Sequence, residues 1–443
     1  MSTRKFNRAL RWMIALALSA FLLASSWHAA PPQQEDKMDS LDRGRVEVMF
    51  GLLQEALKKN YYDPTFHGVD MDARYKVYAE RAKKSPTLGE AFRTIAAYLA
   101  VLDDSHTVFL PPQYAFHFEY GYRMQMVGDQ CLITEVRSGS DASEKLHAGD
   151  RVLSLDGYAV NRKDYWQLEY YLSALAPKPI SNFALRAPSG TERRELVKTA
   201  FSQIQRVTHI IPGESQDEYE KWQHRMKGRF AEMGEALVWK MQFFLPDERE
   251  IDRLIGLARK HSVLLLDLRG NGGGAMPTLR YLVSNLFDHE VHIGTNVTRK
   301  GKSPLNVKTS GKGIFAGKLI VLVDAQSASA AEVLARVVQL EHRGTLIGDR
   351  SEGSVMEAGI YPFQVGLGLP IGFAAEITIA DLIMSDGKSL EKIGVTPDVL
   401  ALPTAADLAA GRDPVLAKAA ELAGIKLDPA SAGKMFPFEW PPD

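Results

Sequence analysis

Cysteine is almost absent from this sequence, since Cys131 is the only one among 443 residues. An intramolecular disulfide is therefore impossible, and neither a cysteine-based metal site nor a Cys-X-X-Cys redox pair can be drawn. We expect Cys131 to pack in a core, where free cysteine behaves as a small apolar side chain. No group of His, Asp and Glu has ligand-like spacing, so the sequence predicts no metal site.

The sequence also lacks an excess of either charge. Its 53 basic and 54 acidic residues give a net charge of −1, which supplies no long-range field for nucleic acid or anionic lipid. A nucleic-acid partner is therefore disfavoured. Hydrophobic residues make up 45% and charged residues 24% of the chain, as in ordinary globular proteins. Since soluble domains run to about 100–200 residues, the length predicts two or three domains.

Long hydrophobic runs are missing, apart from a short one at the N-terminus. Basic residues precede an apolar stretch from Trp12 to Ala24, which falls short of the ~20 residues that cross a bilayer. Small residues follow it, so we predict a signal peptide of residues 1–26, cleaved after Ser26, and an exported protein that is periplasmic or secreted. An uncleaved membrane anchor is the minority alternative.

The periodicity of apolar residues divides the rest of the chain. Residues 27–40 have the composition of a linker, and residues 41–113 show the three- and four-residue spacing of a helical bundle. Short strands and turns follow in residues 114–200. Residues 201–416 alternate between strand and helix patterns, which predicts a layered α/β core, and residues 417–443 form a C-terminal tail.

Three short stretches contain residue types suited to catalysis. The first, residues 102–107, contains His106. The second is a buried strand that runs into a glycine-rich turn, and the third places Ser329 at a helix start. Unpaired N–H groups and the helix dipole favour negative charge there. The N–H of Ala330 and that of Gly272 or Gly273 are candidate donors to an oxyanion. Serine is a weak nucleophile that needs a base, and His106 is the candidate.

Each of these elements also has a purely structural explanation. Ser329 with Glu332 three residues later fits a capping box. The glycine-rich turn lacks the lysine and the Ser/Thr of a P-loop and the spacing of a dinucleotide fingerprint. A lone histidine such as His106 is more often a hydrogen-bonded structural residue. Single motifs therefore do not decide the function.

Residues 149–157, which read Gly-Asp-Arg-Val-Leu-Ser-Leu-Asp-Gly, resemble the PDZ family. In that family a loop of backbone N–H groups captures a peptide's terminal carboxylate, and the peptide adds as a strand. Gly121, Tyr122 and Arg123 occupy the matching place, without the usual two-glycine form. The resemblance implies either peptide capture by these residues or a PDZ-like fold that is only structural.

Taken together and in order, the stretches closely resemble peptidase family S41, which contains the C-terminal processing peptidases and the tricorn core. The resemblance spans about residues 41–416 and includes Ser-Ala-Ser-Ala-Ala-Glu at 327–332 and Gly-Val-Thr-Pro-Asp at 394–398. It implies a crotonase/ClpP-like layered core with an inserted PDZ-like domain, a serine endopeptidase activity on proteins or peptides, and no cofactor. The family pattern makes Ser329 the nucleophile, with Ser327 as the fallback.

The family divides by the base that it uses. In the C-terminal processing branch the base is a lysine, but Ser354 stands at its expected position, and Lys388 or Lys392 would have to replace it. In the tricorn-like branch the base is a histidine oriented by a glutamate. His106 and Glu391 match that pair, and Ser105 matches an auxiliary serine beside the histidine. The resemblance therefore implies a Ser-His-Glu relay, with activity rising through about pH 6–7 as an ordinary histidine titrates.

Two other functions remain open from the sequence. A noncatalytic exported scaffold could bind protein C-termini through the PDZ-like domain, and the retained serine, histidine and glutamate argue against it. An acyl-CoA enzyme that shares the α/β core is disfavoured by the export signal and by the PDZ-like insertion.

Overall fold

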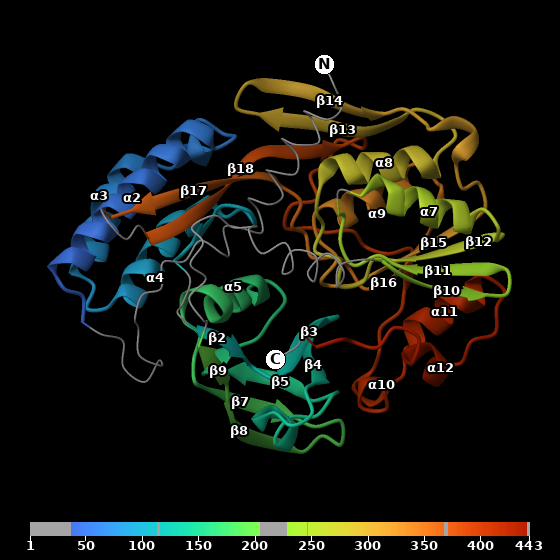
Figure 1. Cartoon of the computed structure of the whole chain (residues 1–443), viewed down its shortest axis with the longest axis horizontal. Coiled ribbons are helices and arrows are strands. Elements are labelled where there is room, and N and C mark those ends of the chain that lie inside the picture. Colours follow the sequence, from blue (N-terminus) through green and yellow to red (C-terminus); the bar gives the residue numbers. More distant parts are fainter. Residues whose placement is uncertain (1–36, 113–115, 204–227, 246, 367–370, 441–443) are drawn as a thin grey trace.

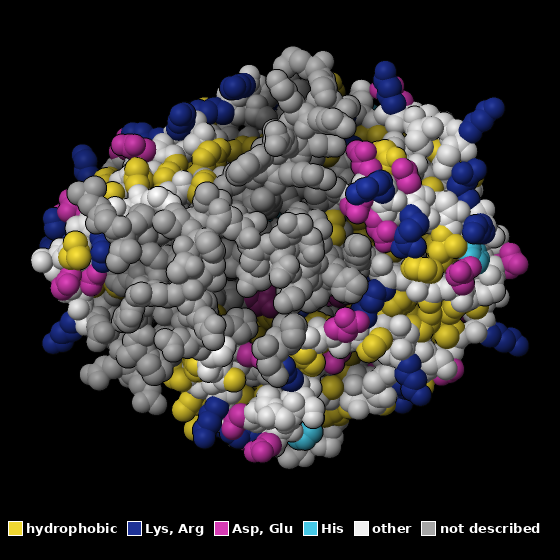
Figure 2. Space-filling view, viewed as in Figure 1, with side chains coloured by type: hydrophobic (Ala, Val, Ile, Leu, Met, Phe, Trp, Pro, Cys, Tyr) yellow, Lys and Arg dark blue, Asp and Glu magenta, His cyan; other side chains and the backbone are white. Residues whose placement is uncertain are grey.

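The computed structural model describes residues 37–112, 116–203, 228–245, 247–366 and 371–440. They form a mixed α/β structure with N-terminal helices and several β-sheets (Figure 1). The predicted signal peptide and most of the predicted linker lie outside these residues. Within the described ranges, no helix is long and apolar enough to span a membrane. Figure 2 shows acidic and basic side chains interspersed over one face, as the balanced composition predicts.

The N-terminal helices form the predicted bundle, and each begins with a side-chain cap from Asp39, Asp70 or Thr87. Their apolar faces share a core with Phe373 and Ile377 of a long strand. That burial supplies most of the stability of such helices in water. The helices are α2 (Ser40–Asn60), α3 (Met71–Lys84) and α4 (Leu88–Leu99), and the short strand β1 (Val108–Leu110) follows.

The middle of the chain is rich in strands, as predicted. Its sheet has the order β3-β4-β5-β7-β8, and its core contains Cys131, which is buried and unpaired as expected. Whether this unit is a PDZ domain stays a prediction. The elements are β2 (Phe116–Glu119), β3 (Tyr122–Val127), β4 (Gln130–Val136), β5 (Arg151–Leu155), β6 (Tyr158–Ala159), α5 (Tyr165–Tyr170), β7 (Ile180–Arg186), β8 (Glu192–Lys198) and β9 (Ala200–Gln203).

The predicted α/β core contains a sheet of order β10-β11-β12-β15-β16-β19, parallel from β11 onward. Alternate side chains of its strands pack on α7, α8 and α9 on one face and on α11 on the other (Figure 1). The elements are β10 (Arg229–Met233), β11 (Ala236–Lys240), α7 (Glu248–Ala258), β12 (Val263–Asp267), α8 (Met276–Leu286), β15 (Lys318–Val323), α9 (Ala330–Leu340), β16 (Gly344–Gly348), β19 (Val399–Leu400), α10 (Ala405–Ala409), α11 (Pro414–Leu422) and α12 (Pro429–Gly433).

A third sheet connects the helical bundle to this core. Its long strand β18 (Ile371–Met384) packs Phe373 into the bundle and Met384 into the core, and it pairs with β1 on one side. The segment that carries His106 lies between α4 and β1, so β18 fixes this segment relative to the core. The other strands are β13 (Val291–Thr298), β14 (Gly301–Val307) and β17 (Glu357–Val365).

Candidate active site

Ser329 lies in the turn between β15 and α9, in a backbone conformation that side chains rarely adopt. Its φ is 53° and its ψ is −119°. A non-glycine residue with positive φ is strained by about 1–3 kcal/mol and persists only where its surroundings impose it. Strained strand-to-helix turns of this kind expose the nucleophile of α/β-hydrolases. The predicted capping box is present as well, with the Ser329 N–H 3.1 Å from Glu332 Oε2.

The glycine-rich turn packs directly on this serine. A Cβ at Gly273 would lie 2.6 Å from the Cβ of Ser329 and 3.1 Å from the Ala330 nitrogen, so only glycine fits there. The Ala328 N–H donates to the carbonyl of Asn271 at 2.9 Å and ties the two turns together. The turns therefore meet as the oxyanion hypothesis requires.

The three predicted oxyanion donors differ in their hydrogen bonds. The Gly273 N–H donates to the side-chain oxygen of Asn271 at 2.8 Å. The N–H groups of Gly272 and Ala330 have no partner among the described residues. In this conformation Gly272 and Ala330, but not Gly273, have N–H groups available to a developing oxyanion.

Ser327, the fallback nucleophile, is in a different environment. Its side chain is completely buried, and its hydroxyl donates to the carbonyl of Leu268 at 2.8 Å. This bond holds the end of β12 to the turn after β15. The geometry gives Ser327 a structural contact and leaves Ser329 as the partly exposed serine of the turn.

The adjacent residues Ser105 and His106 meet Glu391, which lies far from them in the sequence. The Ser105 hydroxyl lies 2.9 Å from Glu391 Oε2 and 2.7 Å from Nδ1 of His106, and the Ser105 N–H donates to Glu391 Oε1 at 2.8 Å. A hydroxyl has one proton, so a bond donated to the carboxylate leaves its oxygen to accept from Nδ1–H. The other ring nitrogen, Nε2, is then the basic one. Ser105 thus stands between the glutamate and the imidazole.

The two candidate catalytic residues Ser329 and His106 are not hydrogen-bonded to each other. Among the described residues, no such bond joins the Ser329 hydroxyl to His106. They are linked indirectly, because the Ser329 N–H donates to the Ser354 carbonyl at 2.7 Å and the next N–H, that of Val355, donates to Glu391 at 3.1 Å. Catalytic hydrogen bonds are often long without substrate and shorten when it binds.

Asp104, next to Ser105, is a buried hub of hydrogen bonds to which the sequence gives no role of its own. Its carboxylate accepts hydrogen bonds from the N–H groups of His106 and Thr107 and from the hydroxyls of Thr107, Thr378 and Tyr61. A carboxylate with so many donors fixes the backbone around it. It therefore holds the His106 segment against β18 and the end of α2.

Burial shifts the ionisation of the groups around this site. Desolvation lowers the pKa of His106 to about 4, although the nearby Asp104 acts in the opposite direction. Desolvation raises the pKa of Glu391, and it raises that of Glu332 to about 7 against the effect of its hydrogen bonds. Burial, with repulsion from Glu332 and other acids, raises the pKa of Glu352 to about 8. The imidazole is therefore neutral near pH 7, as a general base must be.

The two lysines considered as bases are not directed to Ser329 by any hydrogen bond or ion pair. Lys392 pairs with Asp103 at 2.9 Å and lies over the ring of Trp166. The Lys388 ammonium has no hydrogen bond or ion pair among the described residues. Ser354, at the position expected for the lysine, donates its N–H to Glu332 at 2.8 Å.

The residues predicted to capture a peptide carboxylate differ in the surroundings of their side chains. Gly121 is buried, and the Tyr122 ring packs edge-on against Phe183 at 5.1 Å inside the sheet's core. Only Arg123 extends toward the turn of Ser329, where it lies 3.4 Å from the Gln326 side chain.

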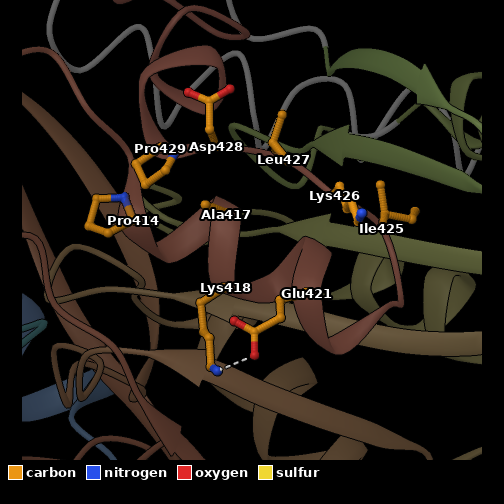
Figure 3. A pocket seen from close by; sticks show the side chains of 9 residues that line it. All are labelled: Pro414, Ala417, Lys418, Glu421, Ile425, Lys426, Leu427, Asp428 and Pro429. Carbon is orange, nitrogen blue, oxygen red and sulfur yellow. Dashed lines mark hydrogen bonds and ion pairs between the residues drawn. The ribbon is translucent and has the colours of Figure 1, made fainter.

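A surface hollow of about 620 Å³ lies at the C-terminal helices, away from these residues. Figure 3 shows its lining, which comes entirely from residues 414–429 of α11, α12 and the loop between them. None of the candidate catalytic residues contributes to it. In the described part of the chain, no cluster of His, Cys, Asp and Glu could hold a metal ion.

Comparisons with known proteins relate the chain to one family of peptidases. The model of peptidase family S41 matches residues 239–401, and the tricorn protease C1 domain matches residues 44–98. The chain is 25% identical over 391 residues to the chloroplastic C-terminal processing peptidase of Tetradesmus obliquus, covering 80% of this chain and 76% of that protein. It is 24% identical over 413 residues to carboxyl-terminal-processing peptidase 3 of Arabidopsis thaliana, covering 87% and 75%.

Solved structures show the same fold. The chain matches mature CPAF with a TM-score of 0.62 at 14% identity, covering 84% of this chain and 95% of that one. It matches the photosystem II D1 C-terminal processing protease with a TM-score of 0.50 at 22% identity, covering 81% and 93%.

Proposed function

Because this chain belongs to peptidase family S41 and is a serine peptidase, we propose that it is an exported endopeptidase with Ser329 as nucleophile, His106 as base and Glu391 as the orienting carboxylate. The observation that carries the proposal is the hydrogen-bonded chain from Glu391 through Ser105 to Nδ1 of His106. A general base becomes an imidazolium when it takes a proton, and a carboxylate linked to its ring stabilises that charge. A histidine with only a structural role gains nothing from such a carboxylate.

The proton path follows from this arrangement. His106 Nε2 removes the proton from Ser329 as its oxygen attacks the peptide carbonyl carbon, and the carbonyl oxygen becomes an oxyanion. The N–H groups of Ala330 and Gly272 are placed at a helix start and a glycine turn, and they stabilise that charge. The imidazolium then gives its proton to the leaving amine, which breaks the peptide bond. Water, deprotonated by His106, hydrolyses the acyl-enzyme.

The serine bridge determines how Glu391 acts. When His106 becomes cationic, its Nδ1–H donates to the Ser105 oxygen, whose own proton points to the carboxylate. The two bonds strengthen together because each polarises the other. The low pKa of His106 makes this assistance necessary, since burial alone opposes the imidazolium. The imidazole has to approach Ser329 when substrate binds.

The substrates that we propose are proteins or peptides, approached through their C-termini. The relatives are named for C-terminal processing, and a PDZ-like unit in residues 114–200, inserted beside a crotonase/ClpP-like core, would suit that recognition. The predicted signal peptide places the enzyme outside the cytoplasm. A Ser-Lys mechanism has less support, because Lys392 is paired with Asp103 and Ser354 stands at the expected lysine position.

Labelling with a serine-reactive fluorophosphonate tests the nucleophile directly. We expect modification of the wild-type protein at Ser329, found by peptide mapping, and none in Ser329→Ala. Ser327→Ala is the matched control because it alters the neighbouring serine of the same turn, and a folded variant should still label at Ser329. Labelling at Ser327, or labelling of Ser329→Ala at the wild-type rate, would overturn the assignment. Loss of casein cleavage in Ser329→Ala would distinguish an enzyme from a peptide-binding scaffold.

A further inference from the structure

The C-terminal segment of the chain returns to the strand that carries Arg123. Beyond α12, the Phe438 ring lies against the Arg123 guanidinium, with 4.4 Å between the guanidinium carbon and the ring centroid. Trp440 meets Phe438 edge-on at 5.1 Å. Figure 1 shows the last described residues running from α12 toward the strands β3 and β4. The segment therefore crosses from the core to the middle unit of the chain.

A second arginine holds the same segment from the core. Arg229, at the start of β10, donates to the Pro437 carbonyl at 2.7 Å and lies 3.3 Å from the Glu439 carboxylate. Its guanidinium carbon is 5.7 Å from the Phe436 ring. Arginine suits these contacts because its planar group stacks on aromatic rings and donates several hydrogen bonds at once. Ring faces, a carbonyl and a carboxylate are groups that other peptides also offer.

Arg123 connects this segment to the proposed catalytic turn. Its other contact is the Gln326 side chain, at 3.4 Å, and Gln326 belongs to the turn that leads from β15 into Ser329. β3 is an end strand of its sheet and pairs with β4 alone among the described strands. End strands are where extended peptides add to a sheet. One side chain therefore lies between the chain's own C-terminal segment and the turn of Ser329, on an end strand of its sheet.

We propose that Arg123 and Arg229 form a binding surface for aromatic, proline-containing peptide segments, and that residues 436–440 occupy it and compete with polypeptide substrates. The competition with substrates rests on the proposed function, whereas peptide binding to the two arginines does not. A tethered segment occupies its site at an effective concentration of about millimolar, so even a weak contact excludes a dilute competitor. The segment would lower the apparent affinity for substrate and leave the chemical step unchanged.

Deletion of residues 438–443 tests the competition. This variant removes Phe438 and Trp440 but keeps Phe436, which packs on the core, and the Pro437 carbonyl that Arg229 holds. We expect kcat/KM for casein to rise roughly fivefold or more, because the deletion removes the cation–π contact of Phe438 with Arg123 that competes with substrate. The gain should come from a lower KM, with kcat unchanged. Phe438→Ala in the full chain should act in the same direction. Lys434→Ala, an exposed change in the same region with no contact to either arginine, is the matched control.

A binding measurement keeps this proposal separate from the proposed function. A fluorescein-labelled peptide of residues 434–443 should bind the Ser329→Ala protein that lacks residues 438–443, and a peptide with Phe438→Ala should bind several-fold more weakly. Binding without cleavage by any variant would support the surface and overturn the proposed function. Unchanged kcat/KM in Phe438→Ala and in the deletion, together with no peptide binding, would overturn the proposal, and a lower melting temperature in the deletion would then give the segment a structural role alone.

Discussion

Replacement of Ser105 by alanine is the sharpest perturbation of the proposed relay. The change removes one hydroxyl that touches both His106 Nδ1 and Glu391 Oε2, and it leaves the main-chain bond from Ser105 to the same carboxylate in place. Glu391 also keeps the N–H of Val355. The fold should therefore survive, with a loss of about 1–2 kcal/mol in the free energy of unfolding.

The effect on catalysis follows from the two bonds that are lost. A hydrogen bond to a charged group contributes about 1.5–3 kcal/mol and a neutral one about 1 kcal/mol. Both matter most when His106 carries the proton, so their loss falls on the transition state and totals about 2.5–4 kcal/mol. At 1.36 kcal/mol for each factor of ten, kcat should drop about 10²- to 10³-fold. KM should change little, because Ser105 does not face the substrate in this proposal.

Steady-state cleavage of a fluorogenic peptide, with the melting temperature measured in parallel, checks this expectation. Ser105→Thr, which keeps the hydroxyl, is the matched control and should retain most of the activity. If Ser105→Ala stays within about threefold of wild type while folded, the hydroxyl does not orient the base, and the relay as we describe it is wrong.

Three further predictions address the same site. Ser329→Ala should lower turnover about 10⁶-fold, as in the subtilisin series, and cost only ~1 kcal/mol of stability as a lost cap; casein cleavage near the wild-type rate would contradict it. Burial lowers the pKa of His106 to about 4, so kcat/KM should fall only when the pH drops through about 4–5, and not through the 6–7 expected from an ordinary histidine. Activity that rises only above about pH 9 would indicate a lysine base instead. His106→Ala should leave only residual activity, and Ser354→Lys in that background should not restore it on the same peptide, since a restored rate would favour a Ser-Lys enzyme.

The elements that carry the site could be predicted from the sequence because their signals are local. The strand-turn-helix pattern around Ser329 predicts a helix start, and the structure begins α9 at Ala330. The apolar spacing before His106 predicts helices, and α2 to α4 are present. The pairing of the His106 segment with Glu391 is not local, since Ser105 and Glu391 are 286 residues apart. That pairing followed from family resemblance, which no periodicity could have replaced.

The details that decide the chemistry could not be predicted, because they depend on single peptide groups and side chains. The sequence places Ser105 beside His106 but does not indicate that its hydroxyl stands between the imidazole and Glu391. It suggests Gly272 and Gly273 equally as oxyanion donors, whereas the bond from Gly273 to Asn271 distinguishes them. The sequence also does not indicate that the Asp104 carboxylate accepts five hydrogen bonds.

Ser354, at the position expected for a catalytic lysine, belongs to a segment whose backbone contacts the proposed site on two sides. The N–H groups of Gly353 and Ser354 donate to the buried carboxylate of Glu332, and the next N–H, from Val355, donates to Glu391. The Ser354 carbonyl in turn accepts the N–H of Ser329. This segment therefore acts through its backbone, holding Ser329 on one side and the Glu391 carboxylate on the other. A lysine side chain added there would bring a cation near both acids, and ion pairing would keep it protonated. The same carboxylates that suit a histidine base thus disfavour a neutral lysine.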